Sequence, residues 1–334
     1  MKPIFNRMTT TFAMLACCAA SSVWAQIGSL PQPPPPGVRP NGAVSAAQFP
    51  DVDVIAPTAP TAQELAPDGL FQFIVHHGST NYTSATGSIL GSLMRWRGGR
   101  SETICPGTIG LDGGYNDFVS ARVRAVAAFV GAPVRPDDQK CTPNVEIIFT
   151  HDPRTVMAAV QQWAARALGV RFDHQMQKAL DVSDEHAIQG WYVTAGGGST
   201  VLNRDPSLIG GVDLQALWAR VIPRSSQTNG ANRSILGVVL VINTKSATGV
   251  GIGALADYAA LASLTVIQNP DQCDPLPSIL DLMSPACASR DKPTGITAGD
   301  VAFLKALYYM NTGIGKTLSR DDIQLNMMKQ FRGS

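Results

Sequence analysis

The segment at residues 253–267, GALADYAALASLTVI, constrains the fold most, because it is apolar around its whole circumference. Asp257 is its only charged residue. A helix of this kind is stable only when other parts of the protein cover all of its faces. We therefore predict a buried helix that ends by Pro270, with further layers of structure packed around it.

The composition is that of a folded protein that does not bind nucleic acid. Hydrophobic residues make up 45% of the 334 positions and charged residues only 15%, which excludes a fully disordered chain. Basic and acidic residues number 26 and 25, for a formal net charge of +1. A nucleic-acid-binding protein would carry a basic surplus or stripe, so we expect no such partner.

The N-terminus has the pattern of an export signal. Basic residues precede an apolar stretch, and Val23 and Ala25 then supply the small side chains that a signal peptidase recognises. We predict a signal peptide at residues 1–25, cleaved after Ala25, and a mature protein in the periplasm or outside the cell. The alternative is a lipoprotein signal that ends at Cys17 and leaves a lipid anchor there. We expect no transmembrane span, because no later apolar stretch reaches the length of about 20 residues that a span needs.

A proline-rich segment follows at residues 26–66. It holds nine prolines in 41 residues, and Phe49 is its only aromatic residue. Such a segment cannot bury enough apolar surface to offset the entropy lost on ordering. We predict a disordered linker there and a single folded domain at residues 67–334.

The cysteine pattern indicates disulfide bonds. Two cysteines lie in the predicted signal, and four remain in the mature chain: Cys105, Cys141, Cys273 and Cys287. Four cysteines allow three pairings, and pairing nearest neighbours in sequence would staple two loop-rich regions. Disulfides are the default for an exported protein, whereas zinc sites usually need closer spacing such as C-x2-C. We therefore expect no metal and no cofactor.

Hydrophobic periodicity predicts an α+β domain with a mixed sheet, early strands and a helical C-terminal third. The strands are expected at residues 69–75, 92–97, 145–150, 188–194 and 236–242, and the further helices at 115–129, 152–168, 213–221, 297–308 and 319–331. Trp191 falls within a strand pattern and is expected in the core. Cap signals support three helix starts, namely Asn116 or Asp117, Asp152 before a proline, and Thr297 with Asp300 three residues on.

Three C-terminal segments occur in a characteristic order. They are residues 255–264 (LADYAALASL), 276–283 (LPSILDLM) and 296–308 (ITAGDVAFLKALY). This series resembles the zincin metallopeptidases, in which an H-E-x-x-H helix precedes a Met-turn and then a helix of the form L-T-x-x-D-x-x-x-x-x-x-L-Y. The chain also resembles an uncharacterised bacterial family of exported proteins, often called lipoproteins, with a degenerate zincin-like domain. The resemblance implies a zincin-like fold over residues 70–330.

The residues that would bind zinc are absent from the matching positions. A zincin binds the metal with two histidines four residues apart, beside a glutamate that acts as general base. Here these three positions are Ala256, Asp257 and Ala260, and no histidine follows His186. The resemblance therefore implies a pseudoenzyme, and we expect a non-catalytic binding or assembly module whose partner is an envelope protein or a glycan.

Asp257 also supports an alternative function. A lone carboxylate on an apolar helix is unfavourable unless it is paired, hydrogen-bonded or protonated. Either it is structural, held by backbone N–H groups or by an arginine such as Arg95 or Arg97, or it is a catalytic acid. The alternative is thus a hydrolase with a non-standard active site around Asp257 and the His76-His77 loop. Because these histidines follow a predicted strand, their side chains should point to opposite faces.

Overall fold

The computed structural model describes the chain from residue 60 onward, with gaps. The described residues are 60–61, 63–78, 93–97, 103–112, 114–135, 141–156, 158, 186–196, 233–267, 270, 272–309 and 318–332. All of them belong to one compact unit, Arg39–Ser334. The predicted signal, most of the predicted linker, the end of the helix at 152–168 and the helix at 213–221 lie outside the described residues.

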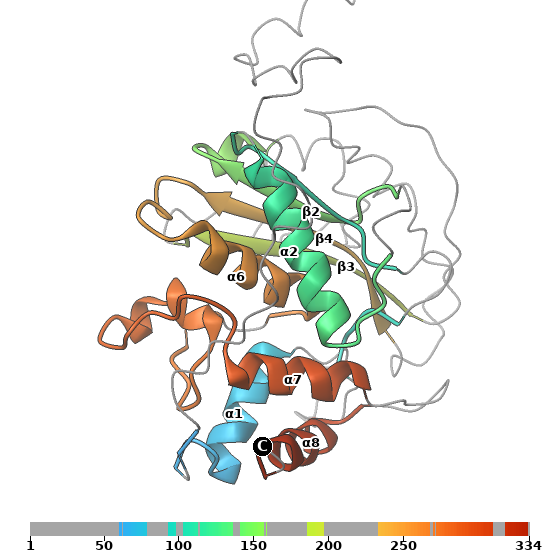
Figure 1. The fold of residues 1–334 in the computed structure, drawn as a ribbon, viewed down its shortest axis with the longest axis vertical. Helices are drawn as coiled ribbons and strands as arrows, with labels where there is room; N and C mark the ends of the chain where they lie inside the picture. The colour runs from blue at the N-terminus through green and yellow to red at the C-terminus, as the bar shows by residue number, and fades with distance from the viewer. Residues whose placement is uncertain are drawn as a thin grey trace, which may run out of the picture. The chain divides into compact units, whose positions relative to one another are not determined.

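A four-stranded mixed sheet forms the centre of this unit (Figure 1). Its strands are β1 (Pro106–Ile109), β2 (Val145–Thr150), β4 (Arg233–Asn243) and β3 (Ile188–Gly196), in that spatial order. The first three strands run parallel, and β3 runs antiparallel to β4. The predicted α+β class and mixed sheet are confirmed.

The two inner strands carry the most continuous apolar runs. In β2 every residue except the last is buried, and in the part of β4 whose burial is described only Leu236 is partly exposed. Strands buried on both faces need such runs of branched apolar residues. The strands predicted at 145–150, 188–194 and 236–242 are confirmed, and the last two extend further than their patterns indicated.

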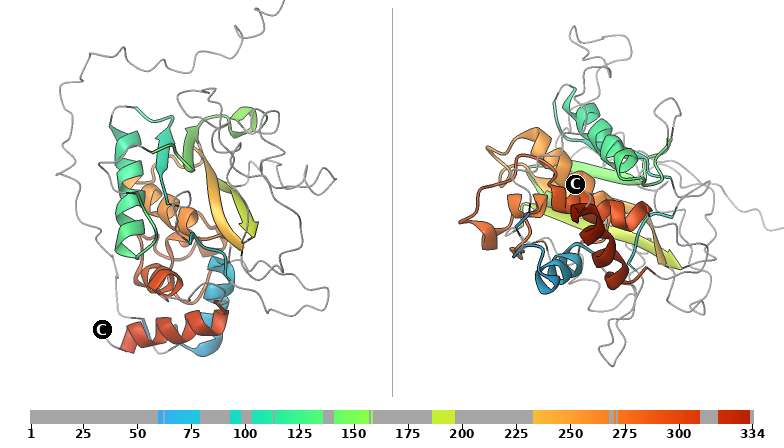
Figure 2. Two further views of the ribbon diagram at one scale, coloured as in Figure 1. Left: turned by 90° about the vertical axis from the view of Figure 1, so that its right-hand side faces the viewer. Right: turned by 60° about the horizontal axis from the view of Figure 1, so that its bottom comes forward.

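Two helices, α2 (Tyr115–Phe129) and α6 (Ile252–Leu264), pack against each other on the same side of the sheet (Figure 2, left). Every residue at 254–264 is buried, as an all-apolar helix requires. The predicted boundaries of α2 match the structure. The α6 helix is confirmed as a buried helix and ends a few residues before Pro270.

The N-terminus of α2 is not capped as predicted. Its N-cap residue is Gly114, without a side-chain hydrogen bond. Asn116 instead exchanges two hydrogen bonds with Leu111, accepting from its N–H (3.2 Å) and donating to its carbonyl (2.8 Å). The asparagine therefore fixes the turn before the helix.

The C-terminal region is helical, as predicted. Its elements are η3 (Ile279–Leu282), η4 (Pro285–Cys287), α7 (Ala298–Tyr309) and α8 (Arg320–Arg332). The helices α7 and α8 pack together, and α8 also packs against the first helix, α1 (Pro67–His77), in the lower part of Figure 1.

Reciprocal side-chain caps define several helix starts. Thr297 and Asp300 each accept the other's backbone N–H at the start of α7, at 3.2 and 3.0 Å, which confirms the predicted capping box. Ser319 and Asp322 repeat the arrangement at α8. Asp152 accepts a hydrogen bond from the backbone N–H three residues on (3.1 Å), as predicted.

The strand predicted at residues 69–75 is wrong, because this segment belongs to helix α1. Its short apolar run GLFQFIV fits either structure when taken alone. The buried residues Leu70, Phe73, Ile74 and His77 are spaced three, four and seven positions from the first, which is helical. Pro67 in the first turn also favours helix initiation.

The strand predicted at residues 92–97 is also not formed as such. In its described part, Arg95 forms an isolated parallel bridge with Ser234 of β4. The backbone N–H of Leu93 instead donates to the Leu318 carbonyl before α8 (3.0 Å). The segment therefore connects the sheet to the helical region.

Aromatic side chains satisfy the last carbonyls of α6. A helix C-terminus leaves carbonyl groups without partners, and burying them unsatisfied is unfavourable. Three donors from separate parts of the chain meet this need: Tyr192 of β3 to Ala262 (2.9 Å), Trp96 to Ser263 (2.8 Å) and Tyr308 of α7 to Leu264 (2.6 Å). The C-terminus of α6 thus joins the sheet to the helical region.

Two disulfides staple the domain, Cys105–Cys141 and Cys273–Cys287. These are the pairs nearest in sequence, and the second encloses η3. Among the described helices, none combines the length and the apolar character needed to cross a bilayer.

We expect Gly110→Ala to destabilise the domain. Gly110 follows β1 with φ of +93°, and a Cβ there would lie 1.9 Å from the backbone oxygen of Phe149. Urea unfolding should report a loss of about 2 kcal/mol or more. Gly253→Ala in α6 is the control, since its Cβ meets open space and the helix gains propensity. Equal stability of the two variants would contradict this account.

Candidate functional site

A cleft of about 220 Å³ lies beside β3 and α6. Its described lining residues come from β3 and the segment before it, from β4, from α6 and from the segment after α6. They are His186, Ile188, Gln189, Gly190, Trp191, Tyr192, Leu240, Tyr258, Ala262, Ile267 and Pro270. The volume is below that of most small-molecule pockets, so it suits one or two side chains of a larger ligand.

The cleft runs along β3 over residues 188–192, and Leu240 of β4 also borders it. The backbone groups of a strand at the end of a sheet alternately face the neighbouring strand and point away from it. The hydrogen bond from Asn243 N–H to the Ala187 carbonyl (2.8 Å) fixes the alternation. With β4 in antiparallel register, the backbone groups of Ile188, Gly190 and Tyr192 point away from β4.

Two residues of α6 line the other wall, Tyr258 and Ala262, one helical turn apart. Ala256 and Ala260, which occupy the zinc-ligand positions in the matching register, are fully buried and are not among the lining residues. Trp191, expected in the core, is half-buried in the cleft wall.

The Tyr192 phenol fixes the two walls relative to each other. Its hydroxyl donates to the Ala262 carbonyl on α6 (2.9 Å). Burial raises the pKa of the Tyr192 phenol, so the group remains a neutral donor at ordinary pH. The β3 edge is therefore held at a set position beside α6.

Asp257 is held by an arginine and a backbone N–H. The Arg122 guanidinium of α2 donates to both carboxylate oxygens, at 2.6 and 3.0 Å, and the Ile296 N–H donates at 2.9 Å. The partners proposed from the sequence, Arg95 and Arg97, were wrong. Arg95 donates instead to the Leu307 carbonyl. Asp257 therefore joins α6 to α2 and to the segment that leads into α7.

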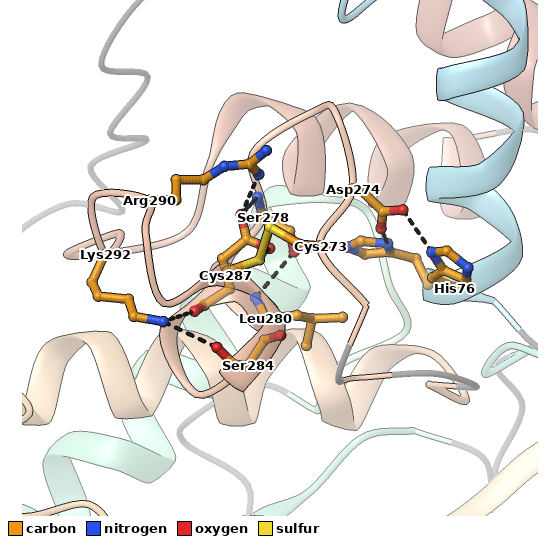
Figure 3. Close-up of a disulfide and its surroundings, with 11 residues drawn as sticks. His76, Cys273, Asp274, Ser278, Leu280, Ser284, Cys287, Arg290 and Lys292 are labelled. Atoms are coloured by element: carbon orange, nitrogen blue, oxygen red, sulfur yellow. Dashed lines mark hydrogen bonds and ion pairs between the residues drawn. A yellow bond between two sulfur atoms is a disulfide. The ribbon is translucent and has the colours of Figure 1, made fainter.

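His76 joins α1 to the loop closed by the second disulfide. Its Nδ1 lies 2.6 Å from a carboxylate oxygen of Asp274, next to Cys273 (Figure 3). The Asp274 side chain is 5% exposed and that of His76 is 16% exposed. A hydrogen bond is strong where water is largely excluded, so this contact secures the end of α1.

His77 lies at the centre of a buried hydrogen-bond network. Its Nδ1 donates to the Phe73 carbonyl (2.8 Å), and its Nε2 lies 2.7 Å from Ser278 Oγ. Ser278 Oγ is also 2.7 Å from an Asp300 carboxylate oxygen. The residue types match a Ser-His-Asp triad, but the hydrogen bond of the histidine Nδ1 goes to a helix carbonyl. Carboxylate oxygens of Asp274 and Asp300 lie 3.9 Å from Nδ1 and 3.3 Å from Nε2. Ser278 is only 1% exposed, so the network lies in the interior. Its hydrogen bonds join α1, η3 and α7.

The sequence did not indicate this network, because residues 69–75 were assigned to a strand. In a strand, His76 and His77 would point to opposite faces. In the last turn of α1 they lie on adjacent faces, and each meets the 274–278 segment. Testing the helical period over residues 67–77 would have placed both histidines in the last turn of one helix. From there both side chains can reach the same segment.

The disulfide loop holds a buried carboxylate, Asp281. Burial raises its pKa above the usual value of 3.8, and the hydrogen bond from Arg290 (2.8 Å) opposes that shift. Asp281 lies beside the sulfurs of Cys273 and Cys287 in an arrangement that could hold a metal ion. The sulfurs are bonded to each other, so they offer no thiolate to a metal.

The two parts of the alternative active site each contact residues 296–300. Asp257 accepts from Ile296 N–H, and Asp300 bonds Ser278, which contacts His77. Across the described residues, no hydrogen bond or ion pair joins Asp257 to His76 or His77. Asp257 and the two histidines therefore belong to separate hydrogen-bond networks.

No family model, curated protein or solved structure matches the chain. The zincin-like resemblance therefore remains a hypothesis that rests on three C-terminal segments. The function has to be inferred from the cleft and the contacts around it.

We expect Arg122 and Asp257 to be strongly coupled. Arg122→Met leaves a buried carboxylate without its cation and should lower the free energy of unfolding by about 3–5 kcal/mol. Adding Asp257→Asn removes that charge and retains an acceptor for Ile296 N–H, so it should restore part of the loss. Urea unfolding of the wild type, the two single variants Arg122→Met and Asp257→Asn, and the double variant should give a coupling energy of about 0.5–3 kcal/mol. Additive single-variant effects would argue against a buried pair.

Proposed function

We propose that the protein is an exported, non-catalytic binding module that takes up an extended peptide segment of an envelope protein along β3. The proposal includes a zincin-like domain that has lost its zinc ligands. The observation that carries it is the cleft along β3, where alternate backbone groups point away from β4.

An extended peptide fits this edge because a sheet edge can accept a further strand. The backbone N–H and C=O groups at Ile188, Gly190 and Tyr192 can each pair with the backbone of an added strand. Gly190 is exposed and carries no side chain to obstruct that approach. Main-chain hydrogen bonds would supply affinity, with little dependence on peptide sequence.

The walls of the cleft would supply selectivity. Trp191 and Tyr192 are partly exposed and give aromatic surface, which favours apolar or aromatic side chains of the peptide. The volume of about 220 Å³ accommodates one or two of them. A glycan would use the aromatic faces but would make no use of alternate backbone groups on a strand, so a peptide is the better fit.

Chemistry on α6 is disfavoured by what its residues offer. Ala256 and Ala260 present methyl groups, which cannot ligate zinc. Asp257 is engaged by Arg122 and Ile296. In the matching register the position of the general base is therefore occupied by an ion-paired carboxylate that holds helices together.

Export is supported by the two disulfides, since such bonds persist in oxidising compartments. The signal pattern at residues 1–25 points the same way. The periplasm or the cell exterior is the location we propose. A lipid anchor at Cys17 stays the alternative to cleavage after Ala25.

The alternative function, a hydrolase, depends on side chains in two separate networks. Asp257 belongs to the contact between α2 and α6, and the two histidines belong to the contact between α1 and the disulfide loop. A turnover activity on peptide substrates that disappears in Asp257→Asn, with folding retained, would favour this alternative.

The test of peptide binding uses Gly190→Pro and Gly190→Ala. Peptides should first be selected from a displayed library of random peptides on the mature chain. Gly190→Pro removes an outward N–H at an edge position, and we expect it to weaken binding of the selected peptides by about tenfold or more. Fluorescence anisotropy with labelled peptides measures the change.

Gly190→Ala is the matched control, because it adds a Cβ in the same place but keeps the N–H. Both variants crowd Leu240, whose side chain would lie 2.9 Å from that Cβ. The alanine variant should bind nearly as well as the wild type. Equal loss in both variants, or no selected peptide that depends on Trp191, would contradict strand addition.

A further inference from the structure

The two cysteines of the second disulfide, Cys273 and Cys287, differ in their access to solvent (Figure 3). Cys273 is half-buried, whereas Cys287 has no exposed surface. A thiolate breaks a disulfide by attacking a sulfur that it can reach, and the other sulfur then leaves. Cys273 is therefore the cysteine open to attack, and Cys287 is the leaving group.

A buried carboxylate lies against the sulfur that would leave. Asp281, which is 1% exposed, places its Oδ1 3.2 Å from Cys287 Sγ. A sulfur in a disulfide carries no hydrogen, so among the described residues Oδ1 has no hydrogen-bond donor in the oxidised loop. Oδ2, in contrast, accepts from Arg290 (2.8 Å) and from the Ser278 N–H (3.3 Å). Reduction would give Oδ1 a donor, the Cys287 thiol.

The surroundings of Asp281 favour its role as a proton carrier. Burial raises the pKa of its carboxyl group, Arg290 opposes the shift and Asp300 of α7 adds to it. The other charged or titratable groups on the elements around this loop are Lys292, Asp274 beside Cys273, His77 of α1 and Asp257 of α6. An acid with a raised pKa retains its proton closer to neutral pH than an exposed aspartate does.

We propose that the Cys273–Cys287 bond is a thiol–disulfide exchange site, at which an external dithiol attacks Cys273 and Asp281 supplies the proton that Cys287 takes up. The site lies on the loop around η3 and uses no residue of the β3 cleft. It therefore does not depend on the peptide-binding function proposed above.

The exchange proceeds in two steps. A thiolate of the dithiol bonds to Cys273 Sγ, and the Cys273–Cys287 bond breaks with its electron pair on Cys287 Sγ, which takes the proton of the Asp281 carboxyl group. The second thiol of the reagent then loses its proton to water and attacks the mixed disulfide, which releases Cys273 as a thiolate. The dithiol is thereby oxidised to a disulfide, and the loop disulfide is reduced to two cysteines.

The first disulfide is an internal control for this chemistry. Cys105 is buried and Cys141 is half-buried, so this bond has the same difference in exposure. Among the described residues no carboxylate contacts either of its cysteines. The two bonds therefore differ in the acid beside the buried sulfur.

The experiment measures how fast dithiothreitol reduces each disulfide in the folded mature chain, by alkylation and mass spectrometry. The ratio of the two rate constants cancels the ionisation of the reagent, because both bonds meet the same thiolate. We expect the rate of Cys273–Cys287 relative to the control bond to fall as pH rises through the pKa of Asp281, since the ionised form has no proton to give. Asp281→Asn should lower this ratio by about tenfold or more and remove its pH dependence.

Arg290→Gln is the matched control, because it removes a partner of the same carboxylate but keeps the carboxylate. It should retain the fast reduction and move the fall in the ratio to higher pH. Glutathione, which has a single thiol, should form its first adduct on Cys273. A ratio that is constant with pH in the wild type, equal slowing in both variants, or a first adduct on Cys287 overturns the proposal. The wild-type pH profile decides the matter even if Asp281→Asn fails to fold.

Discussion

A carboxylate buried on an apolar helix needs a cation or hydrogen-bond donors to compensate its charge. The partners of Asp257 come from α2 and from the segment before α7, so this one side chain links α6 to both. The Arg122 guanidinium brings α2 against α6, and the Ile296 N–H brings the start of the α7 segment to the same carboxylate. A buried pair of this kind adds little net stability over an apolar contact. Separating the two helices would leave a buried charge unpaired, so the pair favours the observed contact between α2 and α6.

The C-terminus of α6 imposes a second constraint that links the core to the cleft. Its last carbonyls accept hydrogen bonds from Trp96, Tyr192 and Tyr308. Tyr192 belongs both to this set and to the cleft wall, so the contact that completes the helix also sets the distance between β3 and α6. If β3 accepts a peptide as we propose, its edge is already held in position, which would lower the entropic cost of binding.

The extent to which the sequence predicts this structure depends on the kind of signal. Long patterns such as α2, β2 and the all-apolar α6 were identified, as was the Thr297–Asp300 capping box, because periodicity and capping act locally. The short run at 69–75 was assigned wrongly, since its apolar residues satisfy both periods. That error hid the contacts of His76 and His77 with residues some 200 positions away.

The candidate sites were harder to predict than the fold. The Arg122–Asp257 pair spans 135 positions, and nothing local distinguishes Arg122 from other arginines. The zinc-ligand register directed attention to Ala256 and Ala260, whereas Tyr258 and Ala262 line the cleft.

Amide hydrogen exchange with a selected peptide bound tests strand addition most directly. We predict slower exchange at Gly190 and Tyr192, whose N–H groups point outward, and little change at Gln189 and Trp191, which pair with β4. Equal protection of all four amides, or protection of none, would contradict it.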